Sequence, residues 1–328
     1  MPTPPSPSHP LILDGGLATT LEAPPFSLPL QTRLWSADAL LTAPKTVRAA
    51  HASFFQHGAQ VGTTASYQAS AAGLQQEGYD CSLRDVVSAS VGAVREALDD
   101  GAQEAAGLVQ RQARFVAGSV GPYGAYLADG SEYTGAYDLS RAGFKDFHRE
   151  RMRVLVDEGV DVLALETLPN GEEVAALVEL LEEQEFANSG VAAWVSLSVK
   201  RSAEGDVTLC DGTPLSAVCA IVEASKHVVA IGVNCVPQDL VTPALRLLRE
   251  HSSKTLLCYP NSGEVWDAEA KVWRGDKSQG ASLEERVREW WEAGARWIGG
   301  CCRVGPRDIM IVRRVVEELW EKEKGRRK

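Results

Sequence analysis

Short apolar runs alternate with longer amphipathic segments along most of the chain. Eight of the runs are rich in β-branched residues or apolar at nearly every position, which is typical of parallel strands buried on both faces. These runs are Leu11–Asp14, Gln60–Ala65, Phe115–Val120, Val162–Glu166, Ala193–Ser198, Val228–Asn234, Thr255–Tyr259 and Trp297–Gly300. Apolar positions between the runs recur with helical spacing, so the pattern predicts strands and helices in alternation.

Several of the intervening segments begin with residues that start helices. Ser82 and Asp85 are spaced like a capping box. Pro214, Pro237 and Pro306 stand where the first turn of a helix accepts proline, because that turn does not need the missing N–H group. We therefore expect helices to begin at these points.

Eight strand-then-helix units predict an α/β fold, a (β/α)8 barrel of the TIM type. A doubly wound open sheet is the alternative, but no Gly-x-Gly-x-x-Gly follows a predicted strand, which weakens its dinucleotide-binding version. Residues 1–10 are rich in proline and serine and are expected to be a disordered lead. Residues 11–328 contain no internal linker, so a single barrel domain is expected there. The stretch Lys200–Asp211 is expected to form an exposed hairpin or lid after the fifth strand.

The composition narrows the class of protein. The chain has 328 residues and a net charge of −11, which argues against nucleic acid as a partner because phosphates require a basic surface. No window approaches the roughly 18 apolar residues of a membrane span, and the N-terminus lacks the basic and apolar regions of a signal peptide. Seven cysteines, an odd number, suggest reduced thiols in the cytoplasm. A cytoplasmic protein without membrane contact is expected, and its oligomeric state is left open.

Three cysteines lie where two of the predicted strands end. In a barrel, the loops after the strands form the active face, and the sixth and eighth strands can face each other across it. Three thiolates favour zinc over harder ions, and three protein ligands leave a fourth position open for a substrate. The cysteines are Cys235, after the sixth strand, and Cys301 and Cys302, after the eighth. Both members of the adjacent pair can face one ion only if the strand breaks, for which Gly299-Gly300 supplies flexibility. Free buried thiols and a redox disulfide between Cys301 and Cys302 are the alternatives.

Two carboxylates end other strands, Asp14 after the first and Glu166 after the fourth. A carboxylate that follows apolar residues needs a partner, because unpaired burial of a charge is costly. The two are positioned to clamp an ammonium group, while backbone N–H groups of Gly15-Gly16 and of the Thr64 region hold a carboxylate. An amino acid is the natural ligand for that combination. The alternative for Asp14 is a cap on the following turn.

Eight segments, from Leu11 to about Arg307 and in the same order, resemble the homocysteine S-methyltransferases. The resemblance is to the branch that uses S-methylmethionine or S-adenosylmethionine. The segments are Asp14-Gly-Gly-Leu-Ala-Thr-Thr-Leu-Glu22, Leu34-Trp-Ser-Ala37, Thr64-Ala-Ser-Tyr-Gln-Ala69, Glu166-Thr167, Asp211-Gly-Thr-Pro214, Gly232-Val-Asn-Cys235, Tyr259-Pro-Asn-Ser-Gly-Glu264 and Gly299-Gly-Cys-Cys-Arg303.

The resemblance implies a zinc-dependent (β/α)8 barrel whose zinc ligands match Cys235, Cys301 and Cys302. It also implies that Asp14 and Glu166 bind the ammonium group of L-homocysteine and that Thr64 lies near its carboxylate. The implied reaction is transfer of a methyl group from a small sulfonium donor to the homocysteine thiol, which forms methionine.

The donor is the less defined partner. Trp35 and Tyr259 are candidates for cation–π contact with the sulfonium, and Glu264 is a candidate for attracting its charge; loop packing or a surface position is the alternative for each. The absence of a glycine-rich nucleotide loop favours S-methylmethionine over S-adenosylmethionine. Betaine is a third candidate donor. A barrel that binds zinc or an amino acid without turnover is the non-enzymatic alternative.

Overall fold

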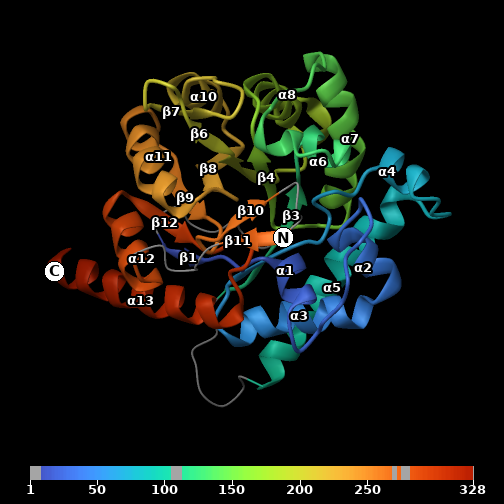
Figure 1. Cartoon of the computed structure of the whole chain (residues 1–328), viewed down its shortest axis with the longest axis horizontal. Coiled ribbons are helices and arrows are strands. Elements are labelled where there is room, and N and C mark those ends of the chain that lie inside the picture. Colours follow the sequence, from blue (N-terminus) through green and yellow to red (C-terminus); the bar gives the residue numbers. More distant parts are fainter. Residues whose placement is uncertain (1–8, 105–112, 268–271, 275–280, 328) are drawn as a thin grey trace.

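Eight parallel strands close into a barrel at the centre of the molecule (Figure 1). The computed structural model describes residues 9–104, 113–267, 272–274 and 281–327. Its barrel strands follow the order β1-β12-β9-β8-β5-β4-β3-β2. Their bounds are β1 Leu11–Ile12, β2 Val61–Thr63, β3 Phe115–Val120, β4 Val162–Leu168, β5 Ala192–Leu197, β8 Val228–Asn234, β9 Thr255–Tyr259 and β12 Ala295–Ile298.

A parallel bridge between Leu13 and Val61 joins β1 to β2, which lie at the two ends of that order. The Gln60 N–H also donates to the Ile12 carbonyl, 2.8 Å away. These contacts close the sheet, so the (β/α)8 barrel is confirmed and the open doubly wound sheet is excluded. All eight predicted strands are present.

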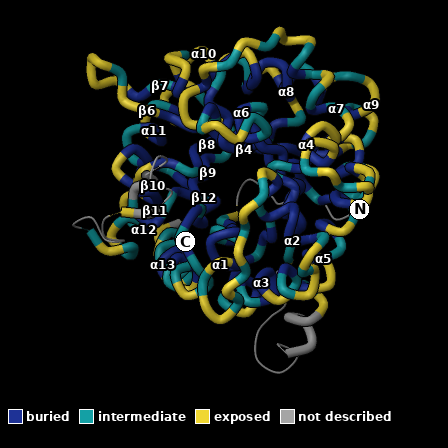
Figure 2. Tube along the Cα trace, turned by 45° about the vertical axis from the view of Figure 1, so that its right-hand side comes forward, coloured by how far each residue is buried: buried dark blue, intermediate teal, exposed yellow. Residues whose placement is uncertain are grey.

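Helices surround the barrel, with their exposed faces outward and their buried faces on the strands (Figure 2). They are α1 Leu17–Glu22, α2 Ser36–Thr42, α3 Pro44–Gln56, α4 Ala71–Gln76, α5 Leu83–Glu104, α6 Tyr123–Leu127, α7 Arg141–Asp157, α8 Gly171–Glu182, α9 Gln184–Ala187, α10 Leu215–Glu223, α11 Gln238–His251, α12 Leu283–Glu292 and α13 Pro306–Arg327. Pro306 is the first residue of α13 as predicted, whereas Pro214 and Pro237 lie one residue earlier, at the N-caps of α10 and α11. The Ser82–Asp85 capping box is confirmed, because the Ser82 N–H donates to Asp85 and the Asp85 N–H donates to Ser82. Within the described residues, no helix is long and apolar enough to cross a membrane.

Alternate residues of each strand point into the barrel, and their character changes along its axis. Near the start of the strands these positions hold apolar side chains that pack into one cluster, including Ala117, Ala164 and Trp194. Two residues further along the same strands, the inward positions are Ser119, Glu166 and Ser196. The polar layer at the carboxyl ends of the strands is where loop residues can meet a ligand.

Two antiparallel hairpins lie outside the eight-stranded sheet. The strands β6 (Val199–Arg201) and β7 (Val207–Leu209) pair antiparallel directly after β5, which confirms the hairpin expected at Lys200–Asp211. A second antiparallel pair, β10 (Val265–Asp267) and β11 (Val272–Arg274), was not predicted. Residues 1–8 of the expected disordered lead lie outside the described residues.

Candidate active site

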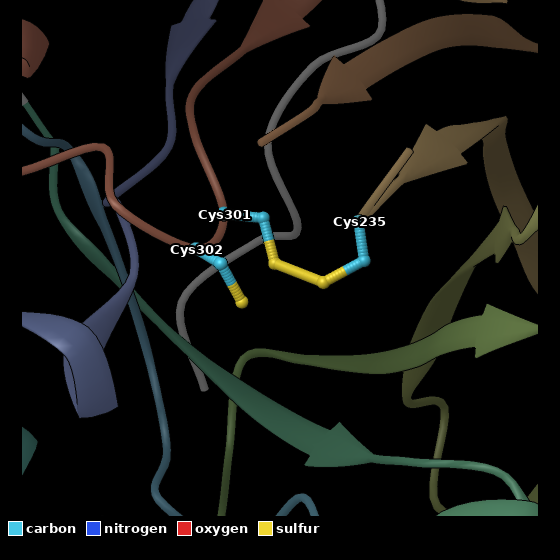
Figure 3. Close-up of side chains that lie close together, drawn as sticks. All are labelled: Cys235, Cys301 and Cys302. Atoms are coloured by element: carbon cyan, nitrogen blue, oxygen red, sulfur yellow. A yellow bond between two sulfur atoms is a disulfide. The ribbon is translucent and has the colours of Figure 1, made fainter. Parts of the chain in front are cut away.

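The side chains of Cys235, Cys301 and Cys302 converge where β8 and β12 end (Figure 3). Their three sulfur atoms lie within 4.8 Å of one another. Cys235 adopts a left-handed backbone conformation (φ 52°) directly after β8. The Cys301 N–H donates to the Pro260 carbonyl (2.8 Å), and the Cys302 carbonyl accepts from the Ser262 N–H (3.1 Å). The loop after β9 therefore holds both cysteines of the adjacent pair.

The glycines before the pair act through close packing. A Cβ atom on Gly300 would lie 2.1 Å from Val304 Cγ1, so no larger residue fits there. The Gly300 N–H donates to the Asp14 carbonyl (3.0 Å), which ties the end of β12 to the residues after β1. Gly299 and Gly300 are not among the glycines with positive φ, so the expected flexible break is instead a tightly packed bend.

A disulfide joins Cys235 to Cys301, whose Cα atoms are 5.5 Å apart. The expectation that the cysteines are reduced is therefore wrong for this pair. The alternative of a disulfide between Cys301 and Cys302 is also wrong, because Cys302 is free and buried. Burial raises the pKa of the Cys302 thiol to about 12, so this thiol needs a nearby positive charge to ionise near neutral pH.

The donor set fits a metal ion once the pair is reduced. Tetrahedral zinc with Zn–S bonds of about 2.3 Å places its sulfur ligands about 3.8 Å apart, a spacing within the 4.8 Å spread of these sulfurs. Three thiolates are a soft ligand set of the kind that binds zinc. A metal ion would also supply the positive charge that a buried Cys302 thiolate requires.

Asp14 lies in the barrel mouth and is 5% exposed. Its two carboxylate oxygens accept hydrogen bonds from Thr63, one from the N–H (2.7 Å) and one from the hydroxyl (2.9 Å). The pKa of this carboxyl is raised to about 7. Burial is the main cause and the nearby Glu166 charge adds to it, while the two hydrogen bonds from Thr63 oppose the rise. Asp14 is thus a carboxylate in need of a cationic partner.

Glu166, on β4, is 7% exposed and is held by side chains of the neighbouring strand β3 and of the more distant strand β9. It accepts hydrogen bonds from the Ser119 hydroxyl and from the Tyr259 hydroxyl, the latter at 3.1 Å. Burial raises the pKa of Glu166, while Ser119, Tyr259 and the charge of Arg151 lower it. The Tyr259 hydroxyl in turn accepts from Trp194 Nε1 (3.0 Å). Tyr259, a candidate for the donor site, therefore supports Glu166 from inside the barrel.

The buried amide of Asn234 connects the Glu166 region to the thiols. Its Oδ1 accepts from the Thr167 N–H and from the Ser196 hydroxyl, and its Nδ2 donates to the Thr167 hydroxyl, each at 2.8 Å. Thr167 follows Glu166 in a left-handed conformation (φ 59°) that is unfavourable for a β-branched residue. Asn234 offsets that cost and immediately precedes Cys235, so one side chain fixes the turns beside a carboxylate and a thiol.

The other residues predicted to bind substrate lie on the loops after β1 and β2. Gly15 follows Asp14 and has no room for a side chain, since a Cβ would lie 2.2 Å from the Val304 carbonyl oxygen. Thr64 is 3% exposed, and its hydroxyl accepts from the Ser119 N–H (2.9 Å) and shares a hydrogen bond with Ser66. Thr63, its neighbour, is the residue that contacts Asp14 directly. Trp35 is partly buried before α2 with φ 50°.

Glu264 forms a bidentate ion pair with Arg303, the residue after the adjacent cysteines. Arg303 Nε and Nη2 lie 3.1 and 2.9 Å from its two carboxylate oxygens, and the Ser262 hydroxyl also donates to it. Because Arg303 neutralises this carboxylate, the geometry gives no support to the predicted attraction of Glu264 for a sulfonium. The pair instead anchors the loop that carries Cys301 and Cys302.

A buried arginine behind the barrel mouth fixes two further loops. Arg151 donates to the carbonyl oxygens of Tyr67 (2.7 Å), Ala69 (3.3 Å) and Gly121 (2.6 Å), and it also contacts the ring of His148. His148 contacts the fully buried carboxylate of Glu173 (2.8 Å). This network was not predicted from the sequence, because its only local signal is a histidine and an arginine three residues apart on one helix.

The comparisons with known proteins agree with this geometry. A family model described as homocysteine S-methyltransferase matches residues 11–316. Homocysteine S-methyltransferase of Escherichia coli (strain K12) is 43% identical over 304 residues, which cover 92% of this chain and 94% of the relative. Homocysteine S-methyltransferase YbgG of Bacillus subtilis (strain 168) is 39% identical, with 93% and 94% covered.

The fold also matches a solved relative. The metallated form of the homocysteine methyltransferase MmuM from Escherichia coli superposes with a TM-score of 0.80 at 39% identity, over 94% of this chain and 96% of that one. The oxidized form of the same protein gives a TM-score of 0.80 at 40% identity, over 93% and 95% of the two chains. With the family model and these relatives covering nearly its whole length, the chain belongs to the homocysteine S-methyltransferase family.

Proposed function

We propose that the protein transfers a methyl group from S-methylmethionine to the thiol of L-homocysteine and forms methionine, with Zn²⁺ held by Cys235, Cys301 and Cys302. The supporting observation is the convergence of three thiols and two buried carboxylates at one end of the barrel. The metallated form of the Escherichia coli relative supports a metal in the family. We place the reaction in the cytoplasm, where the Cys235–Cys301 pair can be kept reduced.

Zinc supplies one kind of chemistry when bound: it lowers the pKa of a thiol that coordinates it, so homocysteine is a thiolate at neutral pH. Three cysteine ligands leave one position for that thiol. The protein then needs no side chain to act as a general base.

Asp14 and Glu166 recognise the other end of homocysteine. Both carboxylates are buried, and each already accepts hydrogen bonds that fix its orientation. A bound ammonium group would compensate their charges and return their pKa values toward the ordinary range. The end of β2 with Thr63, together with Thr64 in the loop that follows, is the proposed site for the homocysteine carboxylate.

The transfer itself balances without a general acid. The homocysteine thiolate attacks the methyl carbon, and a new C–S bond forms as the bond between that carbon and the donor sulfur breaks. The electron pair of the broken bond stays on the donor sulfur, which leaves as a neutral thioether. An anion and a cation become neutral products, so a site that excludes water favours the transition state over the separated charges.

S-methylmethionine is proposed over S-adenosylmethionine because no glycine-rich nucleotide loop follows a strand. The decisive experiment is a methionine-formation assay that offers homocysteine with S-methylmethionine, S-adenosylmethionine or betaine in parallel. Each reaction is run with and without a chelator, followed by zinc repletion. We expect the highest kcat/KM with S-methylmethionine, loss of activity with chelator and recovery with zinc. Activity that survives complete metal removal would refute the role of zinc, and absence of turnover with every donor would favour a non-catalytic binding barrel.

A further inference from the structure

A cavity of about 420 Å³ lies beside the thiols, between the β6–β7 hairpin, the start of α11 and the 3₁₀ turn Ser131–Tyr133. Cys235 lines this cavity, whereas Asp14 and Glu166 do not. Its volume falls within the range of about 300–1,000 Å³ that is usual for sites of small ligands. The cavity therefore reaches the thiol cluster at Cys235 but does not include the two buried carboxylates.

The cavity carries charges of both signs that are loosely held. Arg201 and Asp239 form a long contact of 3.8 Å between Nη2 and Oδ2, with side chains 49% and 57% exposed. Such exposed pairs contribute little, so a ligand can separate them at low cost. Lys200 forms no ion pair within the described part of the chain. Lys200 and Cys210 also line the cavity.

Tyr133 connects the cavity to the thiols. The residue is 41% exposed and lines the cavity. Cys235 and Cys210 line the same cavity, so the Tyr133 side chain and these thiols border one space. A cation that reaches Cys235 from this side passes the aromatic ring.

We propose that this cavity binds the amino-acid end of the sulfonium donor, with the donor carboxylate on Lys200 and Arg201 and its ammonium group on Asp239. The sulfonium then lies beside the Tyr133 ring with its methyl group directed at the homocysteine sulfur near Cys235. This assignment rests on the proposed function. It selects donors that contain a free α-amino acid, a feature shared by S-methylmethionine and the methionine part of S-adenosylmethionine.

The first test separates the charges of the cavity from the rest of the site. Asp239→Asn and Lys200→Gln are each expected to raise the KM for S-methylmethionine about three- to fivefold, the effect of losing one contact of an exposed charge. The KM for homocysteine and kcat are expected to stay within about twofold. The matched controls are Asp206→Asn at the tip of the hairpin and Lys226→Gln before β8, both exposed and outside the cavity. Unchanged donor KM values in both cavity variants, or equal losses for the two substrates, would overturn the assignment.

A second measurement does not depend on turnover. Calorimetric titration of the protein with S-methylmethionine should show binding that Asp239→Asn weakens about three- to fivefold and that Asp206→Asn leaves unchanged. If the unmodified protein binds S-methylmethionine in this way but forms no methionine, the proposed reaction fails and the cavity assignment stands. If methionine forms while Asp239→Asn binds and uses the donor normally, the cavity assignment fails and the reaction stands.

The aromatic contribution has its own control. Tyr133→Leu removes the ring and is expected to lower kcat/KM for the sulfonium donor by about 3- to 30-fold. Tyr133→Phe keeps the ring and is expected to retain most of the activity. Equal losses in the two variants would show that the hydroxyl, and not the ring, acts on the donor.

Discussion

The two sides of the thiol cluster are built in opposite ways. On the inner side, Asp14 and Glu166 are 5% and 7% exposed, and both are oriented by hydrogen bonds from residues of other barrel strands. On the outer side, Arg201 and Asp239 are about half exposed and form one long contact. The inner wall is preorganised before a ligand arrives, whereas the outer wall must rearrange around one.

This difference indicates how selectivity is divided between the two substrates. Buried, hydrogen-bonded carboxylates discriminate strongly, because any ligand that lacks the matching ammonium group leaves them uncompensated. Exposed charges discriminate weakly, because water replaces a missing partner. We therefore expect strict recognition of the methyl acceptor and a more tolerant recognition of the donor.

A substitution in the thiol cluster, which lies between the two walls, should have the largest effect on activity. Cys235→Ala removes one of three metal ligands and is expected to abolish both zinc retention and methyl transfer, since two cysteines make an incomplete site. Elemental analysis of the purified protein and the methionine assay measure the two losses. Cys81→Ala, a cysteine outside the cluster, is the control and should retain both. A Cys235→Ala variant that keeps zinc and activity would contradict the proposed metal site.

The second largest effect is expected for substitutions in the inner wall, the side formed by Asp14 and Glu166. Asp14→Asn keeps the size of the side chain but removes its charge, so the homocysteine ammonium group loses a charge-assisted contact worth about 1.5–3 kcal/mol. The KM for homocysteine is expected to rise roughly 10- to 150-fold. Glu172→Gln, which removes a carboxylate from an exposed ion pair with Arg141, is the control and should change KM little. A donor KM that rises as much as the homocysteine KM would erase the distinction between the walls.

The pH dependence of homocysteine binding sharpens the same point. The pKa of Asp14 is raised to about 7 by burial, and only the ionised carboxylate pairs with an ammonium group. Lowering the pH through 7 protonates Asp14, so the KM for homocysteine should rise about tenfold between pH 8 and pH 6. Steady-state kinetics at several pH values measure this rise. In Asp14→Asn the rise should flatten; a profile that keeps its shape would assign the titration to another group.

The smallest effect is expected at the loop that carries the adjacent cysteines. Glu264→Gln breaks a partly exposed ion pair with Arg303 and is expected to weaken zinc binding about fivefold, the equivalent of about 1 kcal/mol. Competition with a coloured chelator measures the affinity. Glu284→Gln, which breaks the surface pair with Arg314, is the control. Equal affinities in the two variants would show that the Glu264 pair does not position the cysteines.

Most of the barrel could be predicted from the sequence because the signals are local. Parallel strands buried on both faces are continuous apolar runs, and their ends place Asp14, Glu166 and Cys235 at one rim. The β6–β7 hairpin was recognisable as an insertion of unusual length. The hairpin β10–β11 was missed because its strands are only three residues long and lie in a polar loop.

The partners of the site residues could not be predicted in the same way. Glu264 finds Arg303 across 39 residues of sequence, and no local pattern indicates that contact. The pairing of Cys235 with Cys301 likewise depends on how two loops meet. Alternation could have placed Tyr259 and Asn234 correctly, because each shares the parity of inward-facing residues two positions earlier, Leu257 and Gly232. The alternation of inward and outward positions along the strand therefore predicts the inward orientation of Tyr259.

The β6–β7 hairpin has a consequence for how such enzymes diversify. Its two strands pair with each other, and neither belongs to the eight-stranded sheet. Its core positions are buried, but insertions at its tip and substitutions of its exposed residues leave the register of the barrel and the hydrogen bonds of the inner wall intact. A lineage could thus exchange this segment and acquire a new methyl source while inheriting its acceptor chemistry unchanged.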